Sequence, residues 1–409
     1  MKSSPSTVPG QLSEGHDLVR RFLDRDVRSD PYPLLNLIRR SGPVWIRDGV
    51  LVLSSRSHCE AALLATETEM VPPGACPLPS ARLQRLVGLA FDTAAVERLR
   101  PLVRTLVDDR LDSVAARGRL DAVTDLAYPV PMAVLCHLLG VPPGDALQLH
   151  RQVMALSPAL DPHPALTGTD EPPRLAERLQ AEASLDAYLA GVIRTRRRDQ
   201  DGGGGLLSHL LRVEEGVERL SDAEIAAVCR YLLGSGYETT AGLVSGGILA
   251  MLRAPHELAA LRRDPGHARH LVEEVLRLDP PVQVVQRRAE ADLDVCGIPV
   301  PRGTVLVLLL AAAHRDPAVG PSPDVFAAGG PLSHLAFGAG LHQCLGAPLA
   351  RLVASTVLTR FAQRILEPRF ATGHPSYRSN TALRGLRALW VAADGFAGRD
   401  LPWQPGQPA

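Results

Sequence analysis

The sequence contains a single lysine, Lys2, and no long apolar run. A membrane-spanning helix needs about 18 or more consecutive apolar residues, so we expect no membrane span. Its 44 basic and 44 acidic residues balance, which argues against a nucleic-acid partner because phosphate backbones are bound by excess positive charge. The polar N-terminus lacks the apolar core of a signal peptide. We therefore expect a cytoplasmic protein.

The cysteines form no CxxC motif and no pairing pattern. They are scattered singly along the chain, as Cys59, Cys76, Cys136, Cys229, Cys296 and Cys344. This usage is typical of free thiols in a reducing compartment, and it excludes a disulfide scaffold or a zinc site.

Helical periodicity dominates the 409 residues, so the sequence predicts a mainly α protein with small β-sheets. Residues 1–15 are predicted to be disordered. A β-hairpin is expected over residues 44–53, because Asp48 and Gly49 form a favoured two-residue turn. Further helices are expected at 18–23, 33–38, 58–65, 82–89, 94–116, 121–142, 174–198, 221–252, 266–278 and 344–365, with a loop or lid at 157–173 and strands at 282–286, 294–295, 305–309 and 382–392.

The stretch from His334 to Arg351 contains an unusual cysteine. Its fixed positions are Phe337, Gly338, Gly340, His342, Cys344 and Gly346. The glycines permit a tight loop, and a helix is expected to begin near Leu345. A cysteine at a helix N-terminus has a lowered pKa, and a thiolate is an axial ligand for haem iron. A small buried cysteine at a turn is the alternative. The full spacing F-G-x-G-x-H-x-C-x-G favours the ligand.

The helix expected over 221–252 begins at a capping box formed by Ser221 and Glu224. It contains the segment GSGYETT, residues 234–240. A carboxylate and hydroxyls inside an apolar helix are costly unless they have partners or a function. We therefore regard Glu238 and Thr239 as candidate catalytic residues, and a merely capping or solvated polar cluster as the alternative. The pair Gly246-Gly247 is expected to allow close packing of another helix.

The spacing around Cys344 resembles the haem-binding loop of the cytochrome P450 family, bacterial soluble type, and residues 235–240 resemble that family's oxygen-binding helix. The resemblance implies the cytochrome P450 fold, with residues 16–409 as one catalytic domain. Haem b would lie between the long central helix and the cysteine-loop helix, and Cys344 would be the proximal ligand of its iron.

The resemblance also implies roles for individual residues. Gly236 would make room for dioxygen, Thr239 would hydrogen-bond the oxygen or its water, and Glu238 would relay protons. Glu274 and Arg277 would form a structural ion pair that supports the haem loop. The remaining cofactor-binding positions are Phe337 and Gly338 in the loop, Gly346 beside the porphyrin, His342, and His334 and Arg287 on haem propionates.

Three positions depart from the family pattern. Ser80 and Gln84 stand where bacterial members usually carry a propionate-binding histidine and arginine. Gly330 stands where an arginine usually joins the Glu274–Arg277 network. These departures predict weaker propionate anchoring and weaker support of the cysteine loop.

By this resemblance, the chain is a monooxygenase. Dioxygen would be the co-substrate, and electrons would pass from NAD(P)H through ferredoxin reductase and ferredoxin. A medium-sized, largely apolar small molecule of bacterial secondary metabolism is the expected substrate, and a monomer the expected state. The expected substrate contacts are residues 71–79, residues 157–173, Leu233, Gly234, Val284, Val285, Ala382 and Leu383.

Two alternatives remain open at this point. The first is an oxidase of the same family that couples radicals or uses peroxide. The second is a catalytically silent relative that serves as an auxiliary protein, which the three departures would favour.

Overall fold

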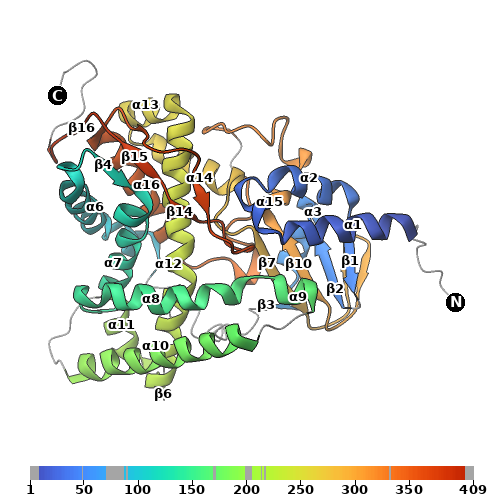
Figure 1. Ribbon diagram of the computed structural model, residues 1–409. Coiled ribbons are helices and arrows are strands. Elements are labelled where there is room, and N and C mark those ends of the chain that lie inside the picture. Colours follow the sequence, from blue (N-terminus) through green and yellow to red (C-terminus); the bar gives the residue numbers. More distant parts are fainter. Residues whose placement is uncertain are drawn as a thin grey trace.

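A long central helix organises the molecule. The computed structural model describes residues 9–47, 49–70, 87–88, 91–168, 172–198, 205–212, 214–215, 218–330 and 333–400. Helix α12 (Asp222–Arg253) spans 32 residues and crosses the middle of the larger, helical part in Figure 1. The other helices of this part are α5 (Thr93–Glu97), α6 (Arg100–Ala115), α7 (Pro129–Leu138), α8 (Ala146–Leu156), α10 (Pro172–Arg198), α11 (Leu206–Arg212), α13 (Pro255–Arg263), α14 (His267–Leu278) and α16 (Ala347–Arg364).

A five-stranded sheet forms the opposite end of the molecule, together with α1 (Pro9–Phe22), α2 (Tyr32–Ser41), α3 (Arg56–Leu64) and α15 (Leu310–Ala313) (Figure 1). Its strands, in spatial order, are β1 (Val44–Arg47), β2 (Val50–Leu53), β10 (Val305–Leu309), β7 (Val284–Ala289) and β3 (Thr68–Met70). β10 runs parallel to β2, and the other neighbours are antiparallel. The predicted hairpin of β1 and β2 is confirmed.

The two faces of this sheet are buried in different clusters because side chains alternate along a strand. Val52 of β2 and Val307 of β10 pack on the side of α1 and α2. Leu51 and Leu306 pack on the other side, against α3. A third and larger core surrounds α12. The prediction of a mainly α fold with small sheets is confirmed.

Short elements connect these parts. The small strands are β4 (Arg119–Asp121), β5 (Glu214–Glu215), β6 (Glu218–Arg219), β8 (Leu293–Val295), β9 (Ile298–Val300), β11 (Ile365–Leu366), β12 (Arg369–Phe370), β13 (Ser376–Tyr377), β14 (Leu386–Ala388), β15 (Trp390–Ala392) and β16 (Gly395–Phe396). The short helical turns are η1 (Arg25–Ser29), η2 (Ala122–Ala127), η3 (Pro143–Asp145), η4 (Ser157–Leu160), α9 (His163–Thr167), η5 (Pro317–Val319) and η6 (Gly340–His342). Among the described residues, no helix combines the length and apolarity needed to cross a bilayer.

The N-terminal prediction needs correction. Helix α1 begins at Pro9, so residues 9–15 are helical where the sequence predicted disorder. Tertiary packing accounts for the difference, because α1 packs on α2 and β1 and buries Val19 and Phe22. The ring of His16 also hydrogen-bonds the carbonyl of Trp45.

Two interior predictions also change. The helix expected over 121–142 is divided, since β4 ends at Asp121 and a π-helical turn precedes α7. The loop expected at 157–173 contains η4 and α9. Asp161 accepts a hydrogen bond from the backbone of His163 at the start of α9, and Gly168 ends that helix in a left-handed conformation with φ of 75°.

The capping box at the start of α12 is confirmed. The Ser221 hydroxyl accepts from the backbone N–H of Glu224 at 3.2 Å, and the Glu224 carboxylate accepts from the backbone of Ser221 at 2.8 Å. Farther along the helix, a Cβ added to Gly247 would lie 2.7 Å from Leu358 of α16. At Gly246 the nearest atom, on Val275 of α14, would lie at 3.5 Å. Gly247 therefore allows α12 and α16 to pack closely.

This difference yields a matched pair of stability variants. Gly247→Ala should be less stable than Gly246→Ala by about 1–3 kcal/mol, the usual cost of overpacking. Both changes gain the same helix propensity, about 1 kcal/mol, so their difference isolates the contact with Leu358. Thermal or urea unfolding of both variants measures it. Equal stability of the two would show that α16 does not press on α12 at this glycine.

Candidate functional site

The loop before α16 presents Cys344 in a fixed backbone setting. Gly338 and Gly340 have φ of 70° and 67°, a region that glycine enters without strain. The backbone N–H of Cys344 donates to the carbonyl of Phe337 at 2.8 Å. A Cβ on Gly340 would approach the carbonyl of Leu63 in α3 at 3.2 Å. The glycines of the predicted motif therefore shape this loop as the sequence indicated.

The sulfur of Cys344 receives hydrogen bonds from the backbone N–H groups of Gly346 and Ala347, at the start of α16. These bonds lower the thiol pKa, but burial raises it by more, and the net shift is upward. The predicted lowering is therefore wrong for the protein alone. The residue nevertheless keeps accessible surface. A cation bound there would favour the thiolate, whose charge the two N–H groups would help to stabilise.

The middle of α12 has accessible surface on one face, although the helix is otherwise largely buried. A Cβ at Gly234 would meet no atom within 4 Å, and at Gly236 only Leu135 at 3.9 Å. Ser235 is exposed and Thr239 is partly exposed on the same helix. The Thr239 hydroxyl donates to the carbonyl of Ser235 at 2.7 Å. Its oxygen lone pairs therefore remain able to accept a hydrogen bond from a ligand.

Glu238 is the buried acid of this segment. Its residue exposure is 6%, and one carboxylate oxygen, Oε2, has no hydrogen-bond partner. Burial raises the pKa of Glu238, while a hydrogen bond from Ser157 and the positive charge of Arg378 oppose this rise. A carboxyl group with a raised pKa can hold and deliver a proton near neutral pH.

Two basic side chains have a buried nitrogen atom without a hydrogen-bond partner. Arg287 on β7 is 2% exposed, and its Nε has no partner. No carboxylate of a described residue pairs with it, and burial lowers the pKa of its guanidinium to about 10, with Tyr231 opposing. The Nε2–H of His342 donates to the carbonyl of Thr68 at 3.2 Å, and its buried Nδ1 has no partner. A carboxylate ligand such as a haem propionate would pair with Arg287, and with Nδ1 of His342 when that ring is protonated.

Both ring nitrogens of His334 contact groups of the protein itself. Its Nε2 contacts the carboxylate of Glu273 at 3.0 Å, and its Nδ1 accepts from the backbone N–H of Ala336 at 3.2 Å. Both ring nitrogens are thus engaged within the protein, which leaves no donor for a haem propionate. The contact of His334 with a propionate therefore stays a prediction, which this orientation of the ring does not favour. The Nδ1 of His342 has no partner, and it can donate to a propionate only when the ring is protonated.

Glu273 connects His334 to the helix that follows Cys344. Arg351 of α16 donates to both carboxylate oxygens of Glu273, at 2.6 and 2.8 Å. The same guanidinium lies over the Phe337 ring, 4.5 Å from its centroid. Glu273 is therefore linked to the cysteine loop through two partners. His334 bonds it directly, and Arg351 connects it to the Phe337 ring.

A pH dependence follows from this network. Burial raises the pKa of Glu273, but the bonds from Arg351 and His334 outweigh it and lower the pKa from 4.5 to about 2. The folded pKa is depressed, so the stabilisation is present above about pH 4.5 and is lost as the pH falls towards about 2. Thermal unfolding at several pH values should show a steeper acid loss for the wild type than for Glu273→Gln. Parallel curves for the two proteins would contradict this assignment.

The pair of Glu274 and Arg277 forms as predicted, with Nε donating to Oε2 at 2.8 Å and Nη2 donating to Oε1 at 2.7 Å. Arg277 also donates to the carbonyls of Pro323 and Val325, and Glu274 accepts from the backbone of Ala327. Backbone groups of 323–327 thus complete the hydrogen bonding near Gly330. The other two departures, Ser80 and Gln84, lie outside the described residues.

The predicted substrate contacts divide into two groups. Gly234 and Val285 keep accessible surface, so either can meet a ligand. The others are buried within the cores or close to the loop of residues 380–385; these are Leu233, Val284, Ala382 and Leu383, with exposures of 0%, 3%, 2% and 5%. Leu233 packs in the main core and Val284 and Ala382 in the second, so the prediction is not supported for these three. Residues 71–79 lie outside the described residues.

Sequence reasoning missed the partners of the motif residues. Glu273, Arg351 and Ser157 contact motif residues from distant parts of the chain. The charge of Arg378 acts on Glu238. Of these partners, only Glu273 had a signal in the sequence, because it lies next to Glu274 of the predicted Glu274–Arg277 pair. The other contacts have no local pattern.

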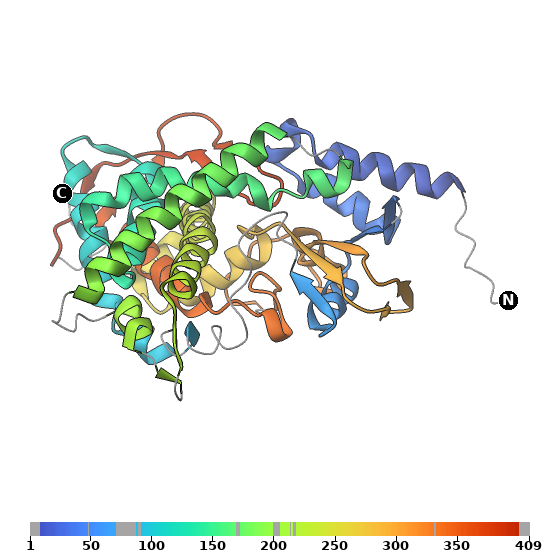
Figure 2. The ribbon, with the colours of Figure 1, turned by 90° about the horizontal axis from the view of Figure 1, so that it is seen from below.

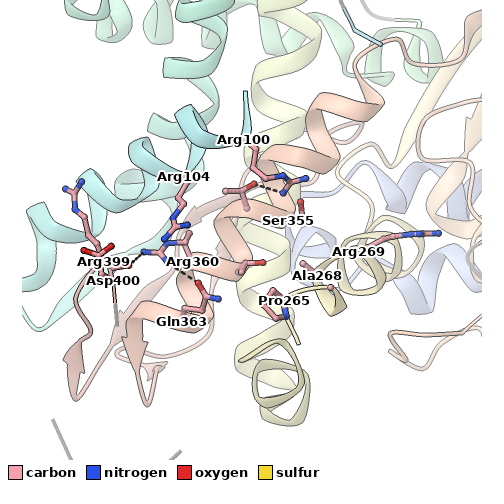
Figure 3. A pocket seen from close by; sticks show the side chains of 13 residues that line it. Arg100, Arg104, Pro265, Ala268, Arg269, Ser355, Arg360, Gln363, Arg399 and Asp400 are labelled. Atoms are coloured by element: carbon pink, nitrogen blue, oxygen red, sulfur yellow. Dashed lines mark hydrogen bonds between the residues drawn. The ribbon is translucent and has the colours of Figure 1, made fainter. Parts of the chain in front are cut away.

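A large pocket lies elsewhere, between α6, α16 and the start of α14 (Figure 3). Its volume is roughly 790 Å³, and arginines dominate its lining. Arg360 is already paired with Asp108 at 2.7 Å, Arg100 with Glu97 and Arg399 with Asp109 and Asp112. Because carboxylates of the same chain already pair with these arginines, we do not assign a ligand to the pocket.

Known proteins resemble this chain over most of its length. A family model described as cytochrome P450 matches residues 157–365. The chain is 34% identical to cytochrome P450 monooxygenase PikC of Streptomyces venezuelae over 406 residues, covering 90% of this chain and 92% of the relative. It is also 34% identical to the biotin biosynthesis cytochrome P450 of Bacillus subtilis, over 76% of each chain. The crystal structure of CYP164A2 of Mycobacterium smegmatis superimposes with a TM-score of 0.85 at 40% identity, covering 92% of this chain and 100% of the other.

The chain belongs to the cytochrome P450 family. Its members are haem monooxygenases, and the residues described above fit that cofactor. Cys344 offers a sulfur that receives backbone hydrogen bonds, and Arg287 offers an unpaired Nε–H for a propionate. Gly234 and Gly236 leave space beside α12. In this chain the cysteine-loop helix α16 packs against α12. Figure 2 shows α12 nearly end-on, with the other helices around it.

Proposed function

We propose that this P450 binds haem b through Cys344 and inserts an oxygen atom from dioxygen into a medium-sized, largely apolar molecule. One observation carries the proposal: a cysteine sulfur with two backbone hydrogen bonds occurs in the same chain as a buried acid and an alcohol on the accessible face of α12. An electron-rich ligand and a proton source are the two protein contributions that oxygen activation requires.

When bound, haem supplies the redox chemistry with dioxygen, and the protein binds, orients and insulates it. Arg287 and His342 would hold the propionates, and Cys344 would ligate the iron. Thr239 would present its hydroxyl to the oxygen site. Glu238, whose pKa is raised by burial, would deliver protons to that site.

Relatives support an apolar substrate. A structural neighbour, CYP109E1 of Bacillus megaterium, binds testosterone, and P450BioI binds a hexadecenoic acid carried on acyl carrier protein. In this chain, the accessible positions Gly234 and Val285 are likewise apolar. A role in secondary metabolism rests on family likeness alone.

We propose that electrons come from NAD(P)H through ferredoxin reductase and ferredoxin, and that the reaction takes place in the cytoplasm. The intact pair of Glu238 and Thr239 favours oxygen activation over a peroxide-driven reaction. It also argues against a silent auxiliary protein, which needs neither residue. Radical coupling uses the same early steps and is the second candidate.

Isotope labelling separates these functions. Substrates would first be found by screening apolar compounds for a spectral shift of the ferric protein. Turnover under ¹⁸O₂ with ferredoxin, reductase and NAD(P)H should then place one labelled oxygen atom in the product. Product without label would indicate coupling, turnover with peroxide alone would indicate a peroxide-driven enzyme, and haem that never turns over would indicate a silent relative.

A further inference from the structure

A small cavity lies where distant segments of the chain meet. Its lining includes Arg28 of η1, Gln283 after α14, and several of the residues 377–385 that lead from β13 to β14. The space for the centre of a water-sized sphere is about 10 Å³. That volume is close to the minimum that one water molecule needs, so the cavity can hold a single small molecule or ion.

Three residues of this lining each have a buried polar atom that lacks a hydrogen-bond partner among the described residues. The atoms are Oε1 of Gln283, the hydroxyl oxygen of Tyr377 and Nε of Arg378. Arg253 lies close enough to influence the Tyr377 hydroxyl, but outside hydrogen-bonding geometry. Buried polar groups are rarely left unpaired, and ordered water is a common partner for those that the protein does not pair itself.

The amide of Gln283 has a defined orientation. Its Nε2 donates to the carbonyl of Pro280 at 2.8 Å and to the hydroxyl of Tyr32 at 3.4 Å, and that hydroxyl in turn donates to Asp279. Rotating the amide by half a turn would place its oxygen against the carbonyl oxygen of Pro280. The free atom of Gln283 is therefore an acceptor, and it requires a donor.

The mixture of free donors and a free acceptor identifies the occupant. Nε of Arg378 can only donate, Oε1 of Gln283 can only accept, and the Tyr377 hydroxyl can do either. A water molecule offers two donors and two lone pairs, so it can pair with all three. A halide ion would be repelled by the oxygen of Gln283, and a metal cation by the guanidinium groups of Arg28 and Arg384 in the same lining.

We propose that this cavity binds one structural water molecule. The water accepts from Nε–H of Arg378, donates to Oε1 of Gln283 and hydrogen-bonds the Tyr377 hydroxyl. It thereby joins β13 to the segment that follows α14. This inference does not depend on the proposed function.

The water strengthens a junction that direct bonds hold at other points. The backbone N–H of Gln283 donates to the carbonyl of Ala382, and that of Arg384 donates to the carbonyl of Pro281, both at 2.7 Å. In the part of the chain that the structure describes, no hydrogen bond joins the side chain of Gln283 directly to residue 377 or 378. The proposed water supplies that connection at the start of the loop.

A high-resolution crystal structure of the haem-loaded protein tests the site. We expect one water peak in the cavity, about 2.6–3.2 Å from each of the three atoms. A second crystal, grown with bromide in place of chloride, would show an anomalous peak there if the occupant were a halide. A cavity without a peak, or one with a bromide peak, would overturn the proposal.

Hydrogen–deuterium exchange tests the junction in solution. Tyr377→Phe removes one partner of the water with little change of shape, so peptides covering residues 376–388 should exchange about two- to tenfold faster, the effect of one net hydrogen bond. Tyr188→Phe is the matched control, because its hydroxyl donates to Asp145 at 2.6 Å and does not line the cavity. These peptides should exchange as in the wild type in that control. Equal exchange in Tyr377→Phe and the wild type would show that the water does not hold β13.

A substitution of the acceptor tests the choice of water. Gln283→Met removes Oε1, so the water peak should weaken or disappear in crystals of this variant. Gln286→Met is the control, since Gln286 also has an unpaired buried Oε1 but lies outside the lining of this cavity, and it should leave the peak unchanged. A peak of full strength in Gln283→Met would contradict the assignment of Gln283 as the acceptor.

Discussion

Replacing Glu274 with Gln should destabilise the protein by about 3–5 kcal/mol, the usual cost of breaking a buried ion pair from one side. Glu274 and Arg277 are 3% and 6% exposed, so the variant would leave a buried guanidinium without its counter-charge. The loss is a large part of a typical stability of about 5–15 kcal/mol. It should appear as a lower urea midpoint and as poor haem retention, because Glu274 also binds the backbone of Ala327.

An exposed pair provides the control. Glu97 and Arg100 have the same (i, i+3) spacing, but their side chains are about half exposed. Glu97→Gln should cost no more than about 1 kcal/mol. A similar loss in Glu97→Gln and Glu274→Gln would mean that burial does not set the strength of these pairs.

Glu238→Gln should lower product formation by about a hundredfold, the low end of the contribution of a general acid. NAD(P)H would still be consumed, with peroxide released in place of product. Because burial raises the pKa of Glu238, wild-type turnover should fall as the pH rises through that pKa. The variant should lack this limb of the profile, since its amide does not titrate.

Thr239 offers a conservative comparison on the same helix. Thr239→Val keeps the shape and removes the hydroxyl, so it should release peroxide in the same way. Thr239→Ser keeps the hydroxyl and should stay close to the wild type. Full product yield in Thr239→Val, at wild-type NAD(P)H consumption, would exclude a role for this alcohol.

The sequence predicted the elements with strong local signals. The hairpin at 44–53, the capping box of Ser221 and the glycine loop before Cys344 each depend on residues close together in the chain, and each formed as expected. The helix at residues 9–15 was missed because its stability comes from packing on α2 and β1. Local composition cannot report a contact of that kind.

The site shows the same division. Cys344, Glu238 and Thr239 were singled out through fixed spacings, and they remain the candidate site residues. The partner of His334 depends on which way its ring turns, and the contact between Ser157 and Glu238 joins positions 81 residues apart in the chain. Leu233 was misplaced because a one-residue change on a helix turns a side chain by about 100°, away from the accessible face.

The absorption spectrum of the reduced protein with carbon monoxide tests the central claim most directly. We expect a strongly red-shifted Soret band in the wild type, its loss in Cys344→Ala, and its retention in Cys296→Ala, which removes an exposed cysteine elsewhere. That pattern would establish a haem iron ligated by the Cys344 thiolate. A haem-free wild type, or a spectrum that Cys344→Ala leaves unchanged, would contradict the account.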